Sequence, residues 1–128
     1  MSSQLGTRIN SVRTVAVAVN DHERALEFYV HKLGFEKRLD ASFGQGQRWV
    51  EVAPSGSQAT IALAPPGPTS APGRDTGIRL STQDATSDCE RLRSAGVDVD
   101  DVLRFPNVPP MFSFRDPDGN QLYVVEGT

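Results

Sequence analysis

Residues 20–35 read NDHERALEFYVHKLGF, which predicts a helix with well-defined ends. Asp21 is suited to cap the first turn, apolar residues recur at spacings of three and four, and Gly34 is suited to end the helix. A second stretch of the same kind begins at Asp84, 63 residues after Asp21, and closes at Gly96. The two stretches indicate one structural unit written twice.

A turn repeats at the same offset. Pro54 and Gly56 in the first half correspond to Pro117 and Gly119 in the second half. Together with the alternating apolar stretches around each helix, these matches predict a duplicated βαβββ unit. Duplicated half-domains usually enclose a shared cleft, and a shared cleft is where a binding site is expected.

The pattern predicts a single α+β domain over residues 1–128. A first module at 12–64, a Pro/Gly-rich linker at 65–75 and a second module at 76–126 make up this domain. Strands are expected at 13–19, 35–42, 48–53, 58–64, 76–82, 97–103, 111–115 and 121–126, and helices at 21–33 and 85–95. Residues 105–110 hold three prolines and are expected to form an irregular loop at the cleft mouth.

The composition excludes several function classes. The 13 basic and 16 acidic residues give a net charge of −3, and the basic residues form no runs, which argues against a nucleic-acid partner. No stretch approaches the roughly 20 apolar residues that cross a bilayer, and residues 1–10 lack a signal-peptide core, so we expect no membrane partner and a cytoplasmic location. The single Cys89 lies in a polar helical stretch and is expected to be a helix residue rather than a nucleophile.

The helix at 20–35 and the later Phe114-Arg115-Asp116-Pro117-Asp118-Gly119-Asn120 resemble the vicinal oxygen chelate superfamily. This superfamily includes glyoxalase I, extradiol dioxygenases, fosfomycin-resistance enzymes and bleomycin-binding resistance proteins. The resemblance covers residues 12–126 and implies two βαβββ modules whose concave sheets line a common cavity. It also implies a homodimer, in which a second subunit can complete the cleft. Because the superfamily supports several chemistries on one scaffold, the resemblance predicts the fold rather than the activity.

Catalytic members of the superfamily hold a divalent metal with His and Glu side chains on the concave face. The resemblance places the corresponding positions at Thr14, Gly77, Thr60 or Ala62, and Tyr123. None of these residues replaces the expected imidazole or carboxylate ligand. The sequence therefore predicts no metal and no cofactor, with a divalent metal as the alternative.

Other residues that could bind a metal have simpler interpretations. His22 and His31, the only histidines, lie on the first helix and are expected to be solvated. Glu126 is expected to be an exposed carboxylate on the strand face that does not line the cleft. Asp116, Asp118 and Asn120 belong to a Pro-Asp-Gly hairpin and are expected to bond their own backbone.

Strand alternation predicts which side chains face the cleft. Where the large aliphatic residues of a strand face the helices, the residues between them face inward. For the second half, the 63-residue offset maps Trp49 and Glu51 onto Phe112 and Phe114. The predicted ligand-binding residues are Thr14, Trp49, Glu51, Thr60, Arg79, Phe112, Phe114 and Tyr123.

This face leaves alternatives open. Its aromatic residues could stack on a flat or amphipathic ligand, or they could fill the sheet interface or a dimer contact. Arg79 needs an anion, which is either Glu51 in a structural pair or an acidic ligand. Glu51 as a base and Tyr123 as an electrophilic stabiliser could also support metal-free proton transfer.

Two function classes follow from these observations. The first is a metal-free small-molecule-binding protein of the bleomycin-resistance type, which sequesters an aromatic or amphipathic drug or metabolite in an aromatic cleft. The second is a glyoxalase- or dioxygenase-like enzyme, a lyase or oxidoreductase, that uses a divalent metal or metal-free acid–base chemistry. The missing His ligands favour the first class, and no catalytic residue is assigned.

Overall fold

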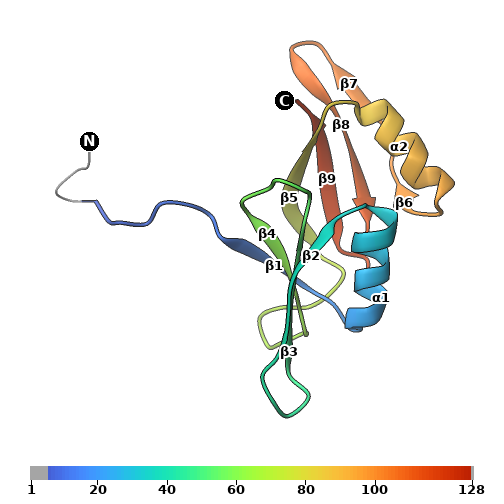
Figure 1. The fold of residues 1–128 in the computed structure, drawn as a ribbon. Helices are drawn as coiled ribbons and strands as arrows, with labels where there is room; N and C mark the ends of the chain where they lie inside the picture. Colours follow the sequence, from blue (N-terminus) through green and yellow to red (C-terminus); the bar gives the residue numbers. More distant parts are fainter. Residues whose placement is uncertain (1–5, 128) are drawn as a thin grey trace.

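The computed structural model describes residues 6–127 and contains two sheets and two helical segments (Figure 1). Helix α1 continues directly into the π-helical segment η1. The elements are β1 Thr14–Ala18, α1 His22–Leu26, η1 Glu27–Lys32, β2 Glu36–Ser42, β3 Arg48–Ala53, β4 Thr60–Ala64, β5 Asp75–Thr82, α2 Ala85–Ser94, β6 Asp98–Val99, β7 Leu103–Phe105, β8 Val108–Arg115 and β9 Gln121–Glu126.

The two sheets have the same topology, as the duplication predicts. The first sheet has the strand order β1-β4-β3-β2, and the second has the order β5-β9-β8-β6, with β7 also paired to β8. In each sheet the first strand is parallel to the last strand, and the other pairs are antiparallel. The fold is therefore α+β, with two βαβββ modules at residues 14–64 and 75–126.

The helix ends follow the sequence signals. Asp21 accepts hydrogen bonds from the backbone N–H groups of Glu23 and Arg24, and Asp84 accepts one from Ser87. Both helical segments are followed by a glycine in the left-handed region, Gly34 at φ 83° and Gly96 at φ 83°. Such a cap satisfies the last helical carbonyls and turns the chain into the next strand.

The two modules share one core. The rings of Phe28 on η1 and Phe114 on β8 lie 6.1 Å apart, so the first module's helix packs against the second module's sheet. Buried residues of both modules form a single cluster around this contact. Both helical segments lie on one side of the molecule (Figure 1). The strand side chains that point away from this side do not pack against the helices and can line a cleft.

The region around residues 97–110 differs from the prediction. The strand expected at 97–103 is divided into β6 and β7, and the loop expected at 105–110 is wrong. These residues form the tip and arms of the β7–β8 hairpin, with Asn107 at φ 66° in the turn. Pro109 and Pro110 are tolerated because this end of β8 lies before the first residue paired with β9, Met111, and its pairing with β7 is irregular.

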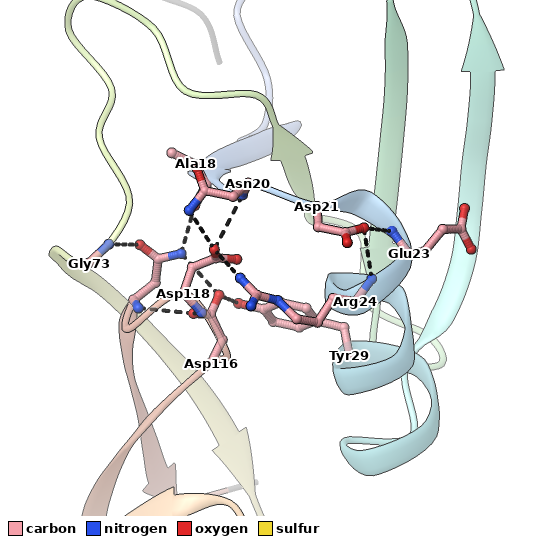
Figure 2. Close-up of polar contacts among 10 residues, drawn as sticks. Ala18, Asn20, Asp21, Glu23, Arg24, Tyr29, Gly73, Asp116 and Asp118 are labelled. Atoms are coloured by element: carbon pink, nitrogen blue, oxygen red, sulfur yellow. Dashed lines mark hydrogen bonds and ion pairs between the residues drawn. The ribbon is translucent and has the colours of Figure 1, made fainter.

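The Asp116–Asn120 turn connects the two modules (Figure 2). As predicted, Asp116 Oδ1 accepts hydrogen bonds from its own turn, from the N–H groups of Asp118 and Asn120, both at 2.9 Å. The same carboxylate also accepts a hydrogen bond from the Tyr29 hydroxyl, at 2.8 Å from Oδ2. Burial, followed by the charge of Asp116, raises the pKa of Tyr29, so the phenol remains a donor.

Further contacts from this turn reach the first module and the linker. The Asn120 side chain donates to the Ala18 carbonyl and accepts from the Gly73 N–H, both at 2.8 Å. Asp118 Oδ1 accepts from Asn20 and from Arg24 Nη2, the latter at 2.7 Å. The prediction that Asp118 and Asn120 bond the backbone of their own turn is therefore wrong, because their side chains reach other segments. The turn therefore holds β1, α1, η1 and the linker in one arrangement.

We expect Tyr29→Phe to lower the free energy of unfolding by about 1–3 kcal/mol, because it removes a donor from a buried carboxylate. Urea unfolding followed by circular dichroism measures this loss. Tyr123→Phe is a matched control, since Tyr123 bonds the exposed Asp75 and should change stability by no more than about 0.5 kcal/mol. Equal losses in the two variants would contradict the connecting role of the turn.

Candidate functional site

A cleft of about 850 Å³ lies where the two modules adjoin. The β3–β4 connection and the start of β4 line the cleft from the first module, together with Val15 of β1, and residues 76–81 of β5 line it from the second. Two of the residues predicted to bind a ligand, Thr60 and Arg79, line this cleft from opposite modules.

The first module places its four predicted residues in one hydrogen-bonded cluster. Thr60 Oγ1 lies 2.8 Å from Thr14 Oγ1 and 2.8 Å from Glu51 Oε1. The Trp49 ring N–H donates to Glu51 Oε2 at 2.7 Å. Alternation along β1, β3 and β4 therefore predicts correctly that these side chains share a face, and Thr60 joins them to the cleft.

Glu51 is a buried carboxylate that is held by neutral donors. Its residue is 8% exposed, and it forms no ion pair with a described residue. The hydrogen bond from Trp49, reinforced by that from Thr60, holds the pKa of Glu51 below its ordinary value. A carboxylate with a lowered pKa is ionised at neutral pH but is a weak general base.

The second module brings Arg79 and Tyr123 together. The guanidinium carbon of Arg79 lies 4.6 Å from the centroid of the Tyr123 ring. The Tyr123 hydroxyl donates to Asp75 at 2.5 Å and accepts from the Gln121 side chain at 2.9 Å. Arg79 does not pair with Glu51, so the structural pair considered for these two residues is wrong.

Alternation also places a polar network on this face of the second sheet. Gln121 Oε1 accepts from Arg115, which forms ion pairs of 2.8 and 2.9 Å with Asp98 and Asp100. Ser113 donates to Asp100. Sequence analysis missed these residues, although the polar side chains alternate with large apolar ones along β8.

The predicted inward orientation of Phe112 and Phe114 is wrong. Both phenylalanines are buried in the core at 1% and 0% exposure, and Phe114 packs on Phe28. They pair across the sheet with Val124 and Leu122, which are also core residues. The cleft side of this sheet is consequently polar, and the aromatic wall expected there is reduced to Tyr123.

A difference in hairpin length explains this error. By the 63-residue offset, Ile61 corresponds to Val124, and the loop closed by the Val52–Ile61 pair is three residues shorter than the loop closed by the Phe112–Val124 pair. A difference of an odd number of residues reverses which side chains face the core, so the 63-residue offset holds in the strand after the turn and fails in the strand before it. The alternation of phenylalanine with Ser113 and Arg115 was the signal that could have corrected the offset.

The remaining candidate metal ligands lie elsewhere. His22 is half-buried rather than solvated, and its Nε2 lies 2.9 Å from the Leu63 carbonyl oxygen. His31 is exposed near Glu27. Glu126 accepts a hydrogen bond from the Ala85 N–H at the start of α2, so it caps a helix and is not the exposed carboxylate expected.

The donor atoms do not fit a divalent metal site. Within residues 6–127, no three His, Cys, Asp or Glu side chains converge as a metal ion requires. On the cleft side of the first sheet, Glu51 already bonds two donors through its two oxygens. No mechanistic step is therefore assigned to a metal.

Comparison with known proteins identifies the family. The model of the glyoxalase/bleomycin resistance protein/dioxygenase superfamily matches residues 9–124. The chain belongs to this superfamily. Thr14, Thr60, Gly77 and Tyr123, which the resemblance equated with metal-ligand positions together with Ala62 as an alternative to Thr60, lie in or beside the cleft described above.

Several relatives have solved structures or curated sequences. TnmS3, an antibiotic-binding protein from Streptomyces sp. CB03234, is 36% identical with a TM-score of 0.86, over 96% of this chain and all of that chain. A superfamily member from Sphaerobacter thermophilus is 37% identical with a TM-score of 0.88, over 94% of this chain and all of that chain. The uncharacterised YetH of Bacillus subtilis is 29% identical over 92% of this chain and 99% of its own length.

Within the described residues, no helix is long and apolar enough to cross a membrane.

The lowered pKa of Glu51 leads to a pH prediction. The ionised carboxylate stabilises the fold fully above the ordinary Glu pKa of about 4.3, and this stability is lost as the pH falls through the lower pKa of the folded state. Glu51→Gln should therefore show a flatter loss of stability below about pH 4 than the wild type. Urea unfolding at a series of pH values measures the two profiles.

Trp49→Phe provides an independent check, because it removes the donor that lowers the pKa of Glu51 most. Its acid profile should lie between those of the wild type and Glu51→Gln. Parallel profiles for all three proteins would show that this hydrogen-bonded cluster does not stabilise the ionised form.

Proposed function

We propose that this protein binds a small organic molecule without a metal and sequesters a drug or metabolite. The observation that carries the proposal is the cleft between the modules, which combines hydroxyl groups, one guanidinium and aliphatic walls. A volume of about 850 Å³ suits a drug-sized ligand. The identity of 36% to an antibiotic-binding protein, over nearly the full length of both chains, supports a binding role.

The ligand we propose is amphipathic or aromatic. Val15 and Ile78 line the cleft and offer apolar surface, since Val15 is 39% exposed and Ile78 is half-buried, whereas Ile61 lines it as a core residue. Trp49 is linked to the cleft by two hydrogen bonds. Its ring N–H donates to Glu51, and Glu51 accepts from Thr60, which lines the cleft. A flat ligand in this position would cover exposed apolar surface and gain hydrophobic stabilisation.

We also propose that the protein acts as a homodimer. The cleft side of each sheet lies opposite the helices, and β2 is exposed along its whole length. Leu39 and Phe43 in this region are 42% and 63% exposed. A second copy would cover these edges and apolar side chains, as isologous dimers commonly do. Sedimentation equilibrium measures the oligomeric state, and a monomer at micromolar concentration would contradict this part of the proposal.

We expect Val15→Phe to weaken ligand binding about tenfold or more, because the larger side chain fills the cleft. Quenching of Trp49, the only tryptophan, by a panel of polycyclic aromatic antibiotics measures the affinity. Val12→Phe is the matched control, since Val12 is 67% exposed and does not line the cleft. Equal binding to both variants would place the ligand elsewhere.

The enzymatic alternative, a lyase or oxidoreductase acting with a divalent metal or by acid–base chemistry, is tested by metal content. We expect elemental analysis of the purified protein to find no stoichiometric metal, and Zn²⁺, Ni²⁺, Mn²⁺ and Fe²⁺ to cause no measurable shift of the melting temperature. Stoichiometric metal, or stabilisation by one of these ions, would favour the enzyme over the binding protein.

A further inference from the structure

We infer that the cleft selects ligands that carry an anionic group, a carboxylate or a phosphate ester, and that Arg79 binds this group. The inference rests on the proposed function and specifies its ligand class. It follows from the charges that line the cleft, from the unused donors of Arg79 and from the backbone feature that orients this side chain.

Among residues 6–127, a single charged side chain lines the cleft. Arg79 is the only Lys, Arg, Asp or Glu among the described residues that line it. The other polar groups are the hydroxyls of five serine and threonine residues, which are Ser55, Ser57, Thr60, Thr76 and Ser81. Three of these hydroxyls already donate within the protein, Ser57 to the Ala59 carbonyl, Thr60 to Glu51 and Thr76 to the Gln121 carbonyl. The guanidinium is therefore the main donor left for an anion, and the lining offers no carboxylate to a cationic ligand.

Most of the N–H donors of the Arg79 side chain form no hydrogen bond with a described residue. Its Nη1 donates to the Gly77 carbonyl at 2.9 Å, and this is the one hydrogen bond that the described residues give its side chain. A guanidinium carries five N–H donors in a planar fork that matches a carboxylate or phosphate. Arg79 forms no ion pair with a described residue, unlike Arg115, which pairs with two aspartates.

Asp75 is the carboxylate that could compete for Arg79. Its oxygens instead accept from the Tyr123 hydroxyl at 2.5 Å and from the Gly77 N–H at 3.0 Å. Asp75 does not line the cleft. The guanidinium therefore remains available to a ligand, while Tyr123 supports it from the ring face.

A local irregularity of β5 orients Arg79. The pairing of β5 with β9 shifts register between Asp75 and Arg79, and Gly77 has a φ of 72°. Thr76 Oγ1 donates to the Gln121 carbonyl and accepts from the Ile78 N–H, which fixes the bulged backbone. Bulges of this kind commonly re-aim a side chain at a binding site. Here the bulge also turns the Gly77 carbonyl toward the guanidinium.

Matched ligands that differ in charge test the inference. Anthracene carboxylate and anthracene carboxamide have the same aromatic body, and naphthyl phosphate adds a phosphate ester. Quenching of Trp49 measures the affinity of each compound for the wild-type protein. We expect the carboxylate to bind about tenfold more tightly than the carboxamide, because charge-assisted hydrogen bonds form only with the anion. A comparable affinity for naphthyl phosphate would extend the class to phosphate esters, and weak phosphate binding would restrict it to carboxylates.

Variants assign the preference to Arg79. Arg79→Gln should remove the carboxylate preference and leave carboxamide binding within about twofold, and Arg79→Lys should restore part of the preference. Arg91→Gln is the matched control, because Arg91 does not line the cleft. It lines an adjoining cavity of about 800 Å³ beside α2, which shares Pro54, Leu80 and Ser81 with the cleft. The Arg91→Gln variant should behave as the wild type.

The possible failures are distinguishable. Binding of both anthracene compounds with equal affinity would overturn the inference and leave the proposed function intact. A carboxylate preference lost in Arg91→Gln but kept in Arg79→Gln would also overturn it, by placing the anion in the other cavity. If the wild type bound none of the three probes, at concentrations where the antibiotic panel still quenched Trp49, the inference alone would fail. Failure of every compound would contradict the proposed function as well.

Discussion

The arrangement of the two modules depends on the buried carboxylate of Asp116. A buried charge is tolerated only when its oxygens are hydrogen-bonded, and Asp116 is 5% exposed. Two backbone amides of its own turn satisfy one oxygen, while Tyr29 and Asn120 satisfy the other. Because Tyr29 belongs to the first module, the helix of that module has to dock on the second for the charge to be stable. This electrostatic requirement fixes a geometry that hydrophobic packing alone would specify less tightly.

The position of the cleft follows from this docking. The helical segments gather on one side of the sheets, and the cleft walls come from the β3–β4 connection and from β5. Each module then adds a different chemistry to the site. The first module contributes Thr60, whose hydroxyl bonds the buried carboxylate of Glu51 behind the cleft wall, whereas the second contributes the free donors of Arg79. Because the two modules contribute different groups, the two walls of the cleft differ in chemistry, as those of a symmetric pair of modules would not.

Sequence signals between neighbouring residues predicted most of the fold. They did not predict contacts between residues that lie far apart in the chain. Helix caps, the glycines after each helix and strand alternation depend on neighbouring residues, so they could be read from the sequence. The cluster around Glu51 followed from alternation alone. The orientation of Phe112 and Phe114 failed because an offset between modules was preferred to the alternation within β8. The reach of Asn120 to Ala18 and Gly73 joins residues far apart in the chain, and no periodicity reports it.

The Asp116–Asn120 turn also differs in sequence from the corresponding turn of the first module. The corresponding turn of the first module, Pro54-Ser55-Gly56, has serine where the second has Asp118, and alanine at 53 where the second has Asp116. Only one copy therefore carries the residues that join the halves. A chain assembled from two first modules would keep both sheets but lose the interlock between them. The two modules therefore share a fold but differ in the residues that join them.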